Sequence, residues 1–314
     1  MKKRRSLSSL FLNKPSAQEA AHLKHLQTLS EKNNGRAFVV DDEQLRLMYL
    51  TPQCIQSAMQ LDAPERLLCA YSRLMMGFIL LHPEPERIIL IGLGGGSLLK
   101  YCYRHFPNAH ITAIEINADV IALRDQFHIP PDSQRLKIVH ADAADYLSQI
   151  KDSVDLIFLD AYDQNGLVAS LNTEKFYANC HRLLNTRGVL VANVWGKPST
   201  IAPMLSQLRQ QFAQQVCWGK SADSYNLIVF ASKTAMSRPH MQQQAEHVQS
   251  QHPEIELKEF VRDMHQVDID ADQDDIPALL DDLRQLLVID PRVPQSYAEW
   301  KSHILQARSH GADG

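Results

Sequence analysis

Four short, largely apolar runs follow one another in the middle of the chain: Ile88–Ile91, Ile111–Ile114, Leu136–Val139 and Val154–Leu159. The segments between them are long enough to hold helices. A strand that is apolar at consecutive positions, rather than at alternate ones, is typical of a parallel sheet buried on both faces. The pattern therefore predicts an α/β fold with a Rossmann-like, doubly wound parallel sheet.

A glycine-rich turn follows the first run, and the second run ends in Glu115. The order strand, glycine turn, helix, strand and acid is that of a nucleoside-binding βαβ unit, and it is more specific than a glycine-rich turn alone. Glycines let the backbone approach a ligand without a Cβ in the way. We expect Glu115 to accept hydrogen bonds from the two hydroxyls of a ribose. The glycines predicted to line the nucleoside are Gly92, Gly94, Gly95 and Gly96.

Acids also follow the third and fourth runs, where ligands bind in open α/β sheets. These are Asp142 and the pair Asp160 and Asp163. The nearest cation, Lys100, lies on the predicted helix and is expected to point away, so an anionic pyrophosphate would find no positive charge there. A cationic sulfonium nucleoside such as S-adenosylmethionine fits better than a nicotinamide dinucleotide. Asp142 would then bind the adenine amino group, although Asp142, like Asp145, can instead cap the next helix.

The same acids predict chemistry on an amine. An aliphatic amine is about 99.9% protonated at neutral pH, and it attacks carbon only after losing a proton. Asp160 could accept that proton and orient the lone pair, with Asp163 holding the same chain. Tyr71 and Tyr162 could contact the cation through a ring face or a phenol oxygen. The alternative for the two aspartates is a structural turn, and for the tyrosines ordinary packing.

These motifs, taken in order, resemble the spermidine/spermine synthase (polyamine aminopropyltransferase) family, from about Phe38 to about Ser232. The resemblance implies a class I methyltransferase-like fold, Ala143 beside the nucleoside, a homodimer, and aminopropyl transfer from decarboxylated S-adenosylmethionine to a polyamine. The segments that are similar to the family's are Leu45–Leu50, Pro64–Tyr71, Ile91–Gly96, Glu115, Asp142, Asp160–Asp163, Ser170–Tyr177 and Arg187–Ala192.

The departures from the family pattern gather on the side of the aminopropyl group and the acceptor. The family's acid in the glycine loop is replaced by Gly95, and the acid after its tyrosine by Ser72. Gln164 stands where the family has a proline, and Ala222 where a late tyrosine lines the amine pocket. An acid at position 95 would bind the donor's amine and repel the carboxylate of intact S-adenosylmethionine. Methyl transfer, or a non-catalytic binding protein, therefore remains an alternative to aminopropyl transfer.

Turn residues and composition changes divide the chain into four predicted parts. Residues 1–35 form a helical arm that ends at Asn33–Gly35, residues 36–85 a β-hairpin and a helix, and residues 86–232 the nucleoside-binding domain. Residues 233–314 form a helical extension. Within it we expect a solvated helix over Met241–Gln251, an acidic linker over Asp268–Asp275, and helices over 276–287 and 297–305.

Composition adds mainly exclusions. The chain has 314 residues, 45% of them apolar, and a net charge of −4, which argues against nonspecific binding of nucleic acid. No apolar run approaches membrane length, and Leu7–Leu12, after the basic tip Lys2–Arg5, is too short for a signal-peptide core. The five cysteines and fourteen histidines show no metal-binding spacing. We expect a cytoplasmic protein with reduced thiols and no metal.

Overall fold

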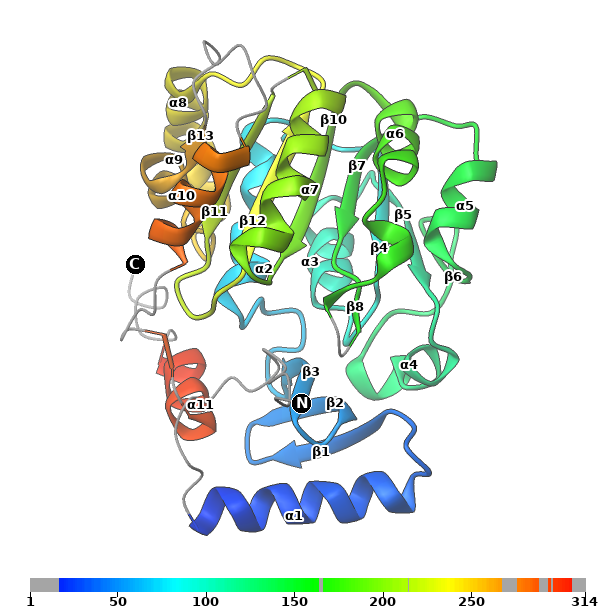
Figure 1. Ribbon diagram of the computed structural model, residues 1–314. Coiled ribbons are helices and arrows are strands. Elements are labelled where there is room, and N and C mark those ends of the chain that lie inside the picture. Colours follow the sequence, from blue (N-terminus) through cyan, green and yellow to red (C-terminus); the bar gives the residue numbers. More distant parts are fainter. Residues whose placement is uncertain are drawn as a thin grey trace.

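Figure 1 shows the computed structural model, which describes residues 17–163, 166–213, 215–266, 276–287, 293–294 and 296–306. Its centre is an eight-stranded sheet in the order β13-β11-β12-β10-β7-β4-β5-β6. Strands β10, β7, β4, β5 and β6 are parallel, whereas β12 runs antiparallel to both of its neighbours. The strands are β4 (Arg87–Ile91), β5 (His110–Glu115), β6 (Leu136–His140), β7 (Val154–Leu159), β10 (Leu184–Val194), β11 (Val216–Lys220), β12 (Leu227–Ser232) and β13 (His265–Gln266).

The central strands are buried on both faces, as their apolar runs predict. In β4, Ile88 and Leu90 belong to the core on one face of the sheet, and Ile89 and Ile91 to the core on the other. The doubly wound α/β fold is therefore confirmed. A strand alternates its side chains between faces, so only a continuous apolar run fills both cores.

Helices cover both faces of the sheet (Figure 1). One face packs against the α2–η1 segment, α3, α8 and α9, and the other against α5, α6, α7 and α10. The helices and 3-10 turns of these layers and of the connections are α2 (Ala70–Met75), η1 (Met76–Leu80), α3 (Ser97–His105), α4 (Ala118–Ala122), η2 (Arg124–Phe127), α5 (Ala143–Gln149), η3 (Ala169–Leu171), α6 (Glu174–Leu183), α7 (Pro198–Gln211), α8 (Arg238–Val248), η4 (Gln249–Gln251), α9 (Leu257–Asp263) and α10 (Ile276–Leu286).

A smaller unit lies beside the main sheet at the lower end of Figure 1. It contains a three-stranded antiparallel sheet, β1 (Phe38–Asp42), β2 (Leu45–Thr51) and β3 (Cys54–Gln60), where the sequence analysis predicted a hairpin. Helix α1 (Ala17–Lys32) and helix α11 (Tyr297–Gln306) share its core through Leu26, Trp300 and Ile304. Segments from the two ends of the chain therefore stabilise the same small sheet. A separate two-stranded ribbon consists of β8 (Tyr162–Asp163) and β9 (Gly166–Leu167).

One expectation for the C-terminal part is wrong. Helix α8, predicted as solvated, buries Met241, Ala245 and Val248 against the main core. These residues recur every third or fourth position, which is the spacing of a single buried helix face. The helices predicted near 276–287 and 297–305 are present as α10 and α11. The acidic linker and the basic N-terminal tip lie outside the described residues.

Candidate active site

A pocket of about 470 Å³ opens at the carboxyl ends of β4, β5, β6 and β7. Gln56 and Ser57 of β3 and Tyr71 of α2 close it from the side of the small sheet. Its volume lies in the range of small-molecule sites. Among the described lining residues there are three acids, Glu115, Asp142 and Asp160, and no lysine, arginine or histidine. Such a lining favours a cationic ligand over an anionic one.

The glycine turn brings the backbone against the pocket floor. Gly92 has φ +93°, and a Cβ there would lie 2.2 Å from the carbonyl oxygen of Asp160. Only glycine fits this conformation and this approach. Gly92 and Gly94 line the pocket, as predicted, whereas Gly95 and Gly96 do not. Gly96 precedes α3 in the left-handed conformation, and Gly95 packs away from the pocket.

Position 95 has no room for the family's acid in this conformation. A Cβ on Gly95 would lie 2.6 Å from Oγ of Ser57 and 2.7 Å from the ring of Phe127. Ser57 Oγ instead accepts a hydrogen bond from the Gly95 amide at 3.0 Å. Ser57 also lines the pocket. Aspartate at position 95 would therefore need Ser57 and Phe127 to move, and the substitution would not simply restore a binding group.

Glu115 ends β5 with its carboxylate at the pocket. Its Oε2 accepts a hydrogen bond from the Leu93 amide (2.9 Å), and its Oε1 accepts one from the Asn117 amide (2.8 Å). The two bonds fix the carboxylate between the glycine turn and the start of α4. Each oxygen keeps a second lone pair, so both can still accept from a pair of vicinal hydroxyls.

Asp142 caps helix α5 and also lines the pocket. Its Oδ1 caps α5 by accepting from the amides of Ala144 (2.7 Å) and Asp145 (3.3 Å). Both bonds use the same oxygen, and Asp142 and Ala143 line the pocket beside Glu115. Asp145 is exposed and is not among the lining residues. The helix cap uses Oδ1, which leaves Oδ2 of Asp142 able to accept a hydrogen bond.

Asp160 follows β7 and is held from two sides. Its Oδ1 accepts a hydrogen bond from Nδ2 of Asn193 (2.8 Å), and Tyr71 donates a second bond to the carboxylate. Burial raises the pKa of the Asp160 carboxyl, and the bonds from Asn193 and Tyr71 oppose that rise. Burial and the nearby Asp160 charge also raise the pKa of Tyr71, so this phenol stays protonated and remains a donor. A carboxylate with a raised pKa is a better proton acceptor than an ordinary one.

Tyr162 lies in the pocket wall, but its hydroxyl does not serve the ligand. The hydroxyl donates to the backbone oxygen of Asn193, and the ring lies 5.4 Å from that of Trp195. The contact of the Tyr162 ring with a cation stays a prediction. The backbone of Asp163 is in strand β8, but its side chain lies outside the described residues, as does Gln164. The role predicted for Asp163 stays a prediction.

Several residues of the site were not predicted from the sequence. Asn193, at the carboxyl end of β10, orients Asp160, and Nδ2 of Asn226 donates in turn to Oδ1 of Asn193 (2.8 Å). Asn193 directly follows the segment Arg187–Ala192, so the rule that ligands bind beyond strand ends could have found it. No comparable signal marked Gln56 or Ser57, because they come from the small sheet.

Asp223 anchors the helix that carries Tyr71. It is buried and accepts hydrogen bonds from the Ala70 amide (2.7 Å) and from Oγ of Ser221 (2.9 Å). Its neighbour Ala222 stands where the family pattern has a tyrosine. In this chain the loop provides no tyrosine at that position. Its Asp223 instead accepts a hydrogen bond from the first amide of α2.

Lys100 points away from the pocket, as expected. Its Nζ is buried and donates to the backbone oxygen of Phe127 at 2.7 Å. Burial lowers the pKa of Lys100 to about 7. The described part of the chain thus places no cation of α3 at the glycine turn.

The fold and the acid-lined pocket define a class I methyltransferase-like, nucleoside-binding protein. Residues 68–237, more than half of the chain, match the spermine/spermidine synthase domain. The chain belongs to the spermine/spermidine synthase family.

Individual relatives agree with this assignment. The chain is 36% identical over 200 residues to a polyamine aminopropyltransferase of Chromobacterium violaceum, which covers 63% of this chain and 77% of that protein. It is 30% identical over 199 residues to one of Neisseria meningitidis, which covers 63% and 76%. A probable spermidine synthase of Corynebacterium glutamicum shares the fold, with a TM-score of 0.58, 20% identity and coverage of 66% of this chain and 82% of that one.

No helix in the described part of the chain is both long enough and apolar enough to cross a membrane.

Proposed function

We propose that this protein is a transferase that moves the aminopropyl group of decarboxylated S-adenosylmethionine to a small-molecule amine, in the manner of polyamine biosynthesis. The observation on which this rests most is Asp160. It is a partly buried carboxylate with a raised pKa, held by Asn193 and Tyr71 in a pocket that also presents Glu115 and Asp142. The relatives named polyamine aminopropyltransferase support the same reaction.

The nucleoside end of the pocket suits the donor. Glu115 would accept from the ribose hydroxyls and Asp142 from the adenine amino group, with Ala143 beside the base. Gly92 and Gly94 allow the donor to lie against the backbone of the turn. The absence of basic side chains among the described lining residues favours the positive sulfonium. The protein would need no metal for this reaction, because the sulfonium already activates the carbon that is attacked.

The reaction is a displacement at the carbon that joins the aminopropyl chain to sulfur. Asp160 accepts a proton from the acceptor's ammonium group, and the freed lone pair forms the new nitrogen–carbon bond. The carbon–sulfur bond breaks, and its electron pair stays on sulfur, which leaves neutral methylthioadenosine. Tyr71 and Asn193 keep the carboxylate in place for the proton transfer. Asp163 would bind the same acceptor chain, and the Tyr162 ring would face its charge.

The acceptor is expected to be a polyamine. Gly95 and Ser72 do not line the described pocket, so the side chains that would select the acceptor are not assigned to these two departures from the family pattern. We also expect a homodimer and a cytoplasmic location, in line with the family resemblance.

The test is product analysis with the full-length protein. Decarboxylated and intact S-adenosylmethionine are each incubated with a panel of aliphatic diamines and triamines, and the nucleoside products are separated by mass spectrometry. Aminopropyl transfer gives methylthioadenosine and an acceptor extended by one aminopropyl unit. S-adenosylhomocysteine and a methylated amine would instead identify a methyltransferase. Tight nucleoside binding with no turnover of any acceptor would identify a non-catalytic relative.

A further inference from the structure

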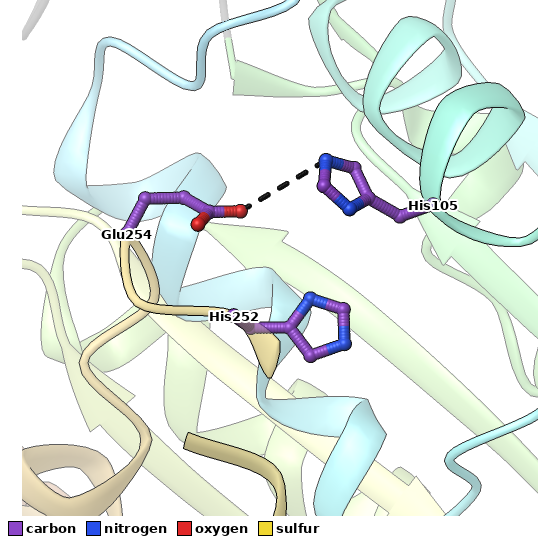
Figure 2. A group of neighbouring side chains, drawn as sticks. All are labelled: His105, His252 and Glu254. Carbon is purple, nitrogen blue, oxygen red and sulfur yellow. Dashed lines mark ion pairs between the residues drawn. The ribbon is translucent and has the colours of Figure 1, made fainter. Parts of the chain in front are cut away.

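A second group of side chains with metal-binding chemistry lies away from the pocket. His105 ends helix α3, whereas His252 and Glu254 lie between η4 and α9, almost 150 residues later in the chain (Figure 2). One donor atom from each of the three lies within 4.8 Å of the other two. None of the three lines the candidate active site. The function proposed above leaves this cluster unexplained.

The donor atoms are of the kind that zinc prefers. Two imidazoles and one carboxylate form the His₂Glu set of many zinc sites, which leave a fourth position for water. Nε2 of His105 is 4.0 Å from Oε1 of Glu254. Donors around a tetrahedral zinc stand about 3.3 Å apart with bonds near 2.0–2.1 Å, so a modest movement closes the site.

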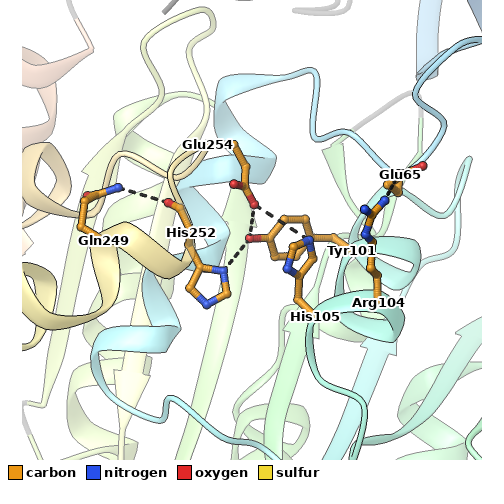
Figure 3. A network of polar contacts seen from close by, with 7 residues as sticks. All are labelled: Glu65, Tyr101, Arg104, His105, Gln249, His252 and Glu254. Carbon is orange, nitrogen blue, oxygen red and sulfur yellow. Dashed lines mark hydrogen bonds and ion pairs between the residues drawn. The ribbon is translucent and has the colours of Figure 1, made fainter. Parts of the chain in front are cut away.

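The surroundings hold the ligands in place and leave an entry for an ion. The Tyr101 hydroxyl donates to Oε1 of Glu254 (2.6 Å) and lies 2.9 Å from Nδ1 of His252 (Figure 3). Oε1 of Glu254 is also the atom that lies 4.0 Å from Nε2 of His105, so a bound ion would share this oxygen with Tyr101 or use Oε2. Nε2 of Gln249 donates to the His252 backbone oxygen at 3.1 Å. The His252 side chain is buried, whereas Glu254 is exposed, so an ion can arrive from solvent on the carboxylate side.

We propose that His105, His252 and Glu254 form a binding site for a divalent transition metal, with zinc as the ion of choice. The bound ion links α3 to the segment between α8 and α9. Because α3 begins directly after the glycine turn, the ion fixes the far end of the helix that starts at the nucleoside pocket. A ligand that binds only the folded state stabilises it in proportion to its occupancy.

The experiment uses the full-length protein, freed of metal with a chelator and titrated with zinc in a calorimeter and with cobalt(II) in an absorption spectrometer. The variants are His105→Ala and Glu254→Gln, of which the second keeps the side chain's shape and its acceptor for Tyr101. His240→Ala is the matched control, because His240 is an exposed histidine of α8 outside the cluster.

We expect one tight zinc ion per chain, visible d–d bands of cobalt in a tetrahedral site, and a rise in Tm of about 4 °C at a hundredfold excess of zinc over its Kd. Zinc affinity should fall at least about tenfold in both variants and stay unchanged in His240→Ala. Tm without metal should stay near that of the wild type in Glu254→Gln, which excludes unfolding as the cause. The proposal would be overturned if the wild type bound no stoichiometric zinc, or if His105→Ala and Glu254→Gln bound zinc as tightly as the wild type does. Neither result depends on transferase activity.

Discussion

Replacing Asp160 by asparagine tests the central step of the proposed reaction. The structure allows this substitution with little rearrangement, because an asparagine Oδ1 can accept the same 2.8 Å hydrogen bond from Asn193. The change removes the negative charge and the ability to accept a proton. General-base assistance contributes about 10²–10⁴-fold, so we expect kcat to fall by that factor, which corresponds to about 2.7–5.4 kcal/mol in the transition state.

The same substitution should not destabilise the protein. Burial raises the folded-state pKa of Asp160 above its ordinary value of 3.8, so the folded state binds the proton more tightly than the unfolded state does. Above the folded-state pKa the ionised carboxyl therefore opposes folding, and this cost disappears as the pH falls through that pKa. A neutral asparagine removes the cost at pH 7. We expect Tm of Asp160→Asn to equal or exceed that of the wild type.

The assay follows methylthioadenosine release from decarboxylated S-adenosylmethionine under saturating amine, over a range of pH. In the wild type, kcat/KM should fall on the acid side with an apparent pKa above 3.8. This fall should be absent from Asp160→Asn. Calorimetry should show unchanged affinity for methylthioadenosine, and Asp145→Asn, an exposed acid on α5, serves as control. Turnover of Asp160→Asn within about threefold of the wild type would refute the role of proton acceptor.

Three further predictions concern binding and stability. Glu115→Ala should weaken methylthioadenosine at least about tenfold by calorimetry, since it removes both ribose acceptors, and wild-type affinity would exclude this site. Asp142→Asn should keep the cap of α5 and therefore the Tm, but it should weaken binding of the nucleoside. Asp142→Ala should weaken binding and also lower stability by about 1 kcal/mol. Equal nucleoside affinity in the wild type and both variants would show that Asp142 serves only as the helix cap. Burial lowers the pKa of Lys100 to about 7, so between pH 7 and 10.5 the unfolded state binds more protons than the folded state, and the free energy of unfolding should rise with pH. In urea unfolding, Lys100→Met should lose this dependence on pH. An unchanged dependence in the variant would contradict the prediction.

The sequence was sufficient for the main sheet and for the nucleoside end of the site. A continuous apolar run suits a strand that is buried on both faces, so the central strands β4 and β7 were predictable from local pattern, whereas β6, at the sheet edge, exposes Lys137 and His140. Glu115, Asp142 and Asp160 follow strands directly, and parallel strands bring their carboxyl ends to one edge. The positions of these three acids in the sequence were therefore enough to predict that they lie close together in the fold.

Tertiary structure decided what depends on contacts between distant segments. Ser57 occupies the space that a side chain at position 95 would need, and it comes from a different sheet. Asn193 and Tyr71 set the environment of Asp160 from β10 and α2, and α8 turned out to be packed rather than solvated. His105 and His252 show no metal-binding spacing in the sequence because the fold alone brings them together. The periodicity of a segment indicates which of its faces is buried. The exposure, pKa and ligand geometry of a side chain depend in addition on which distant segments pack against it.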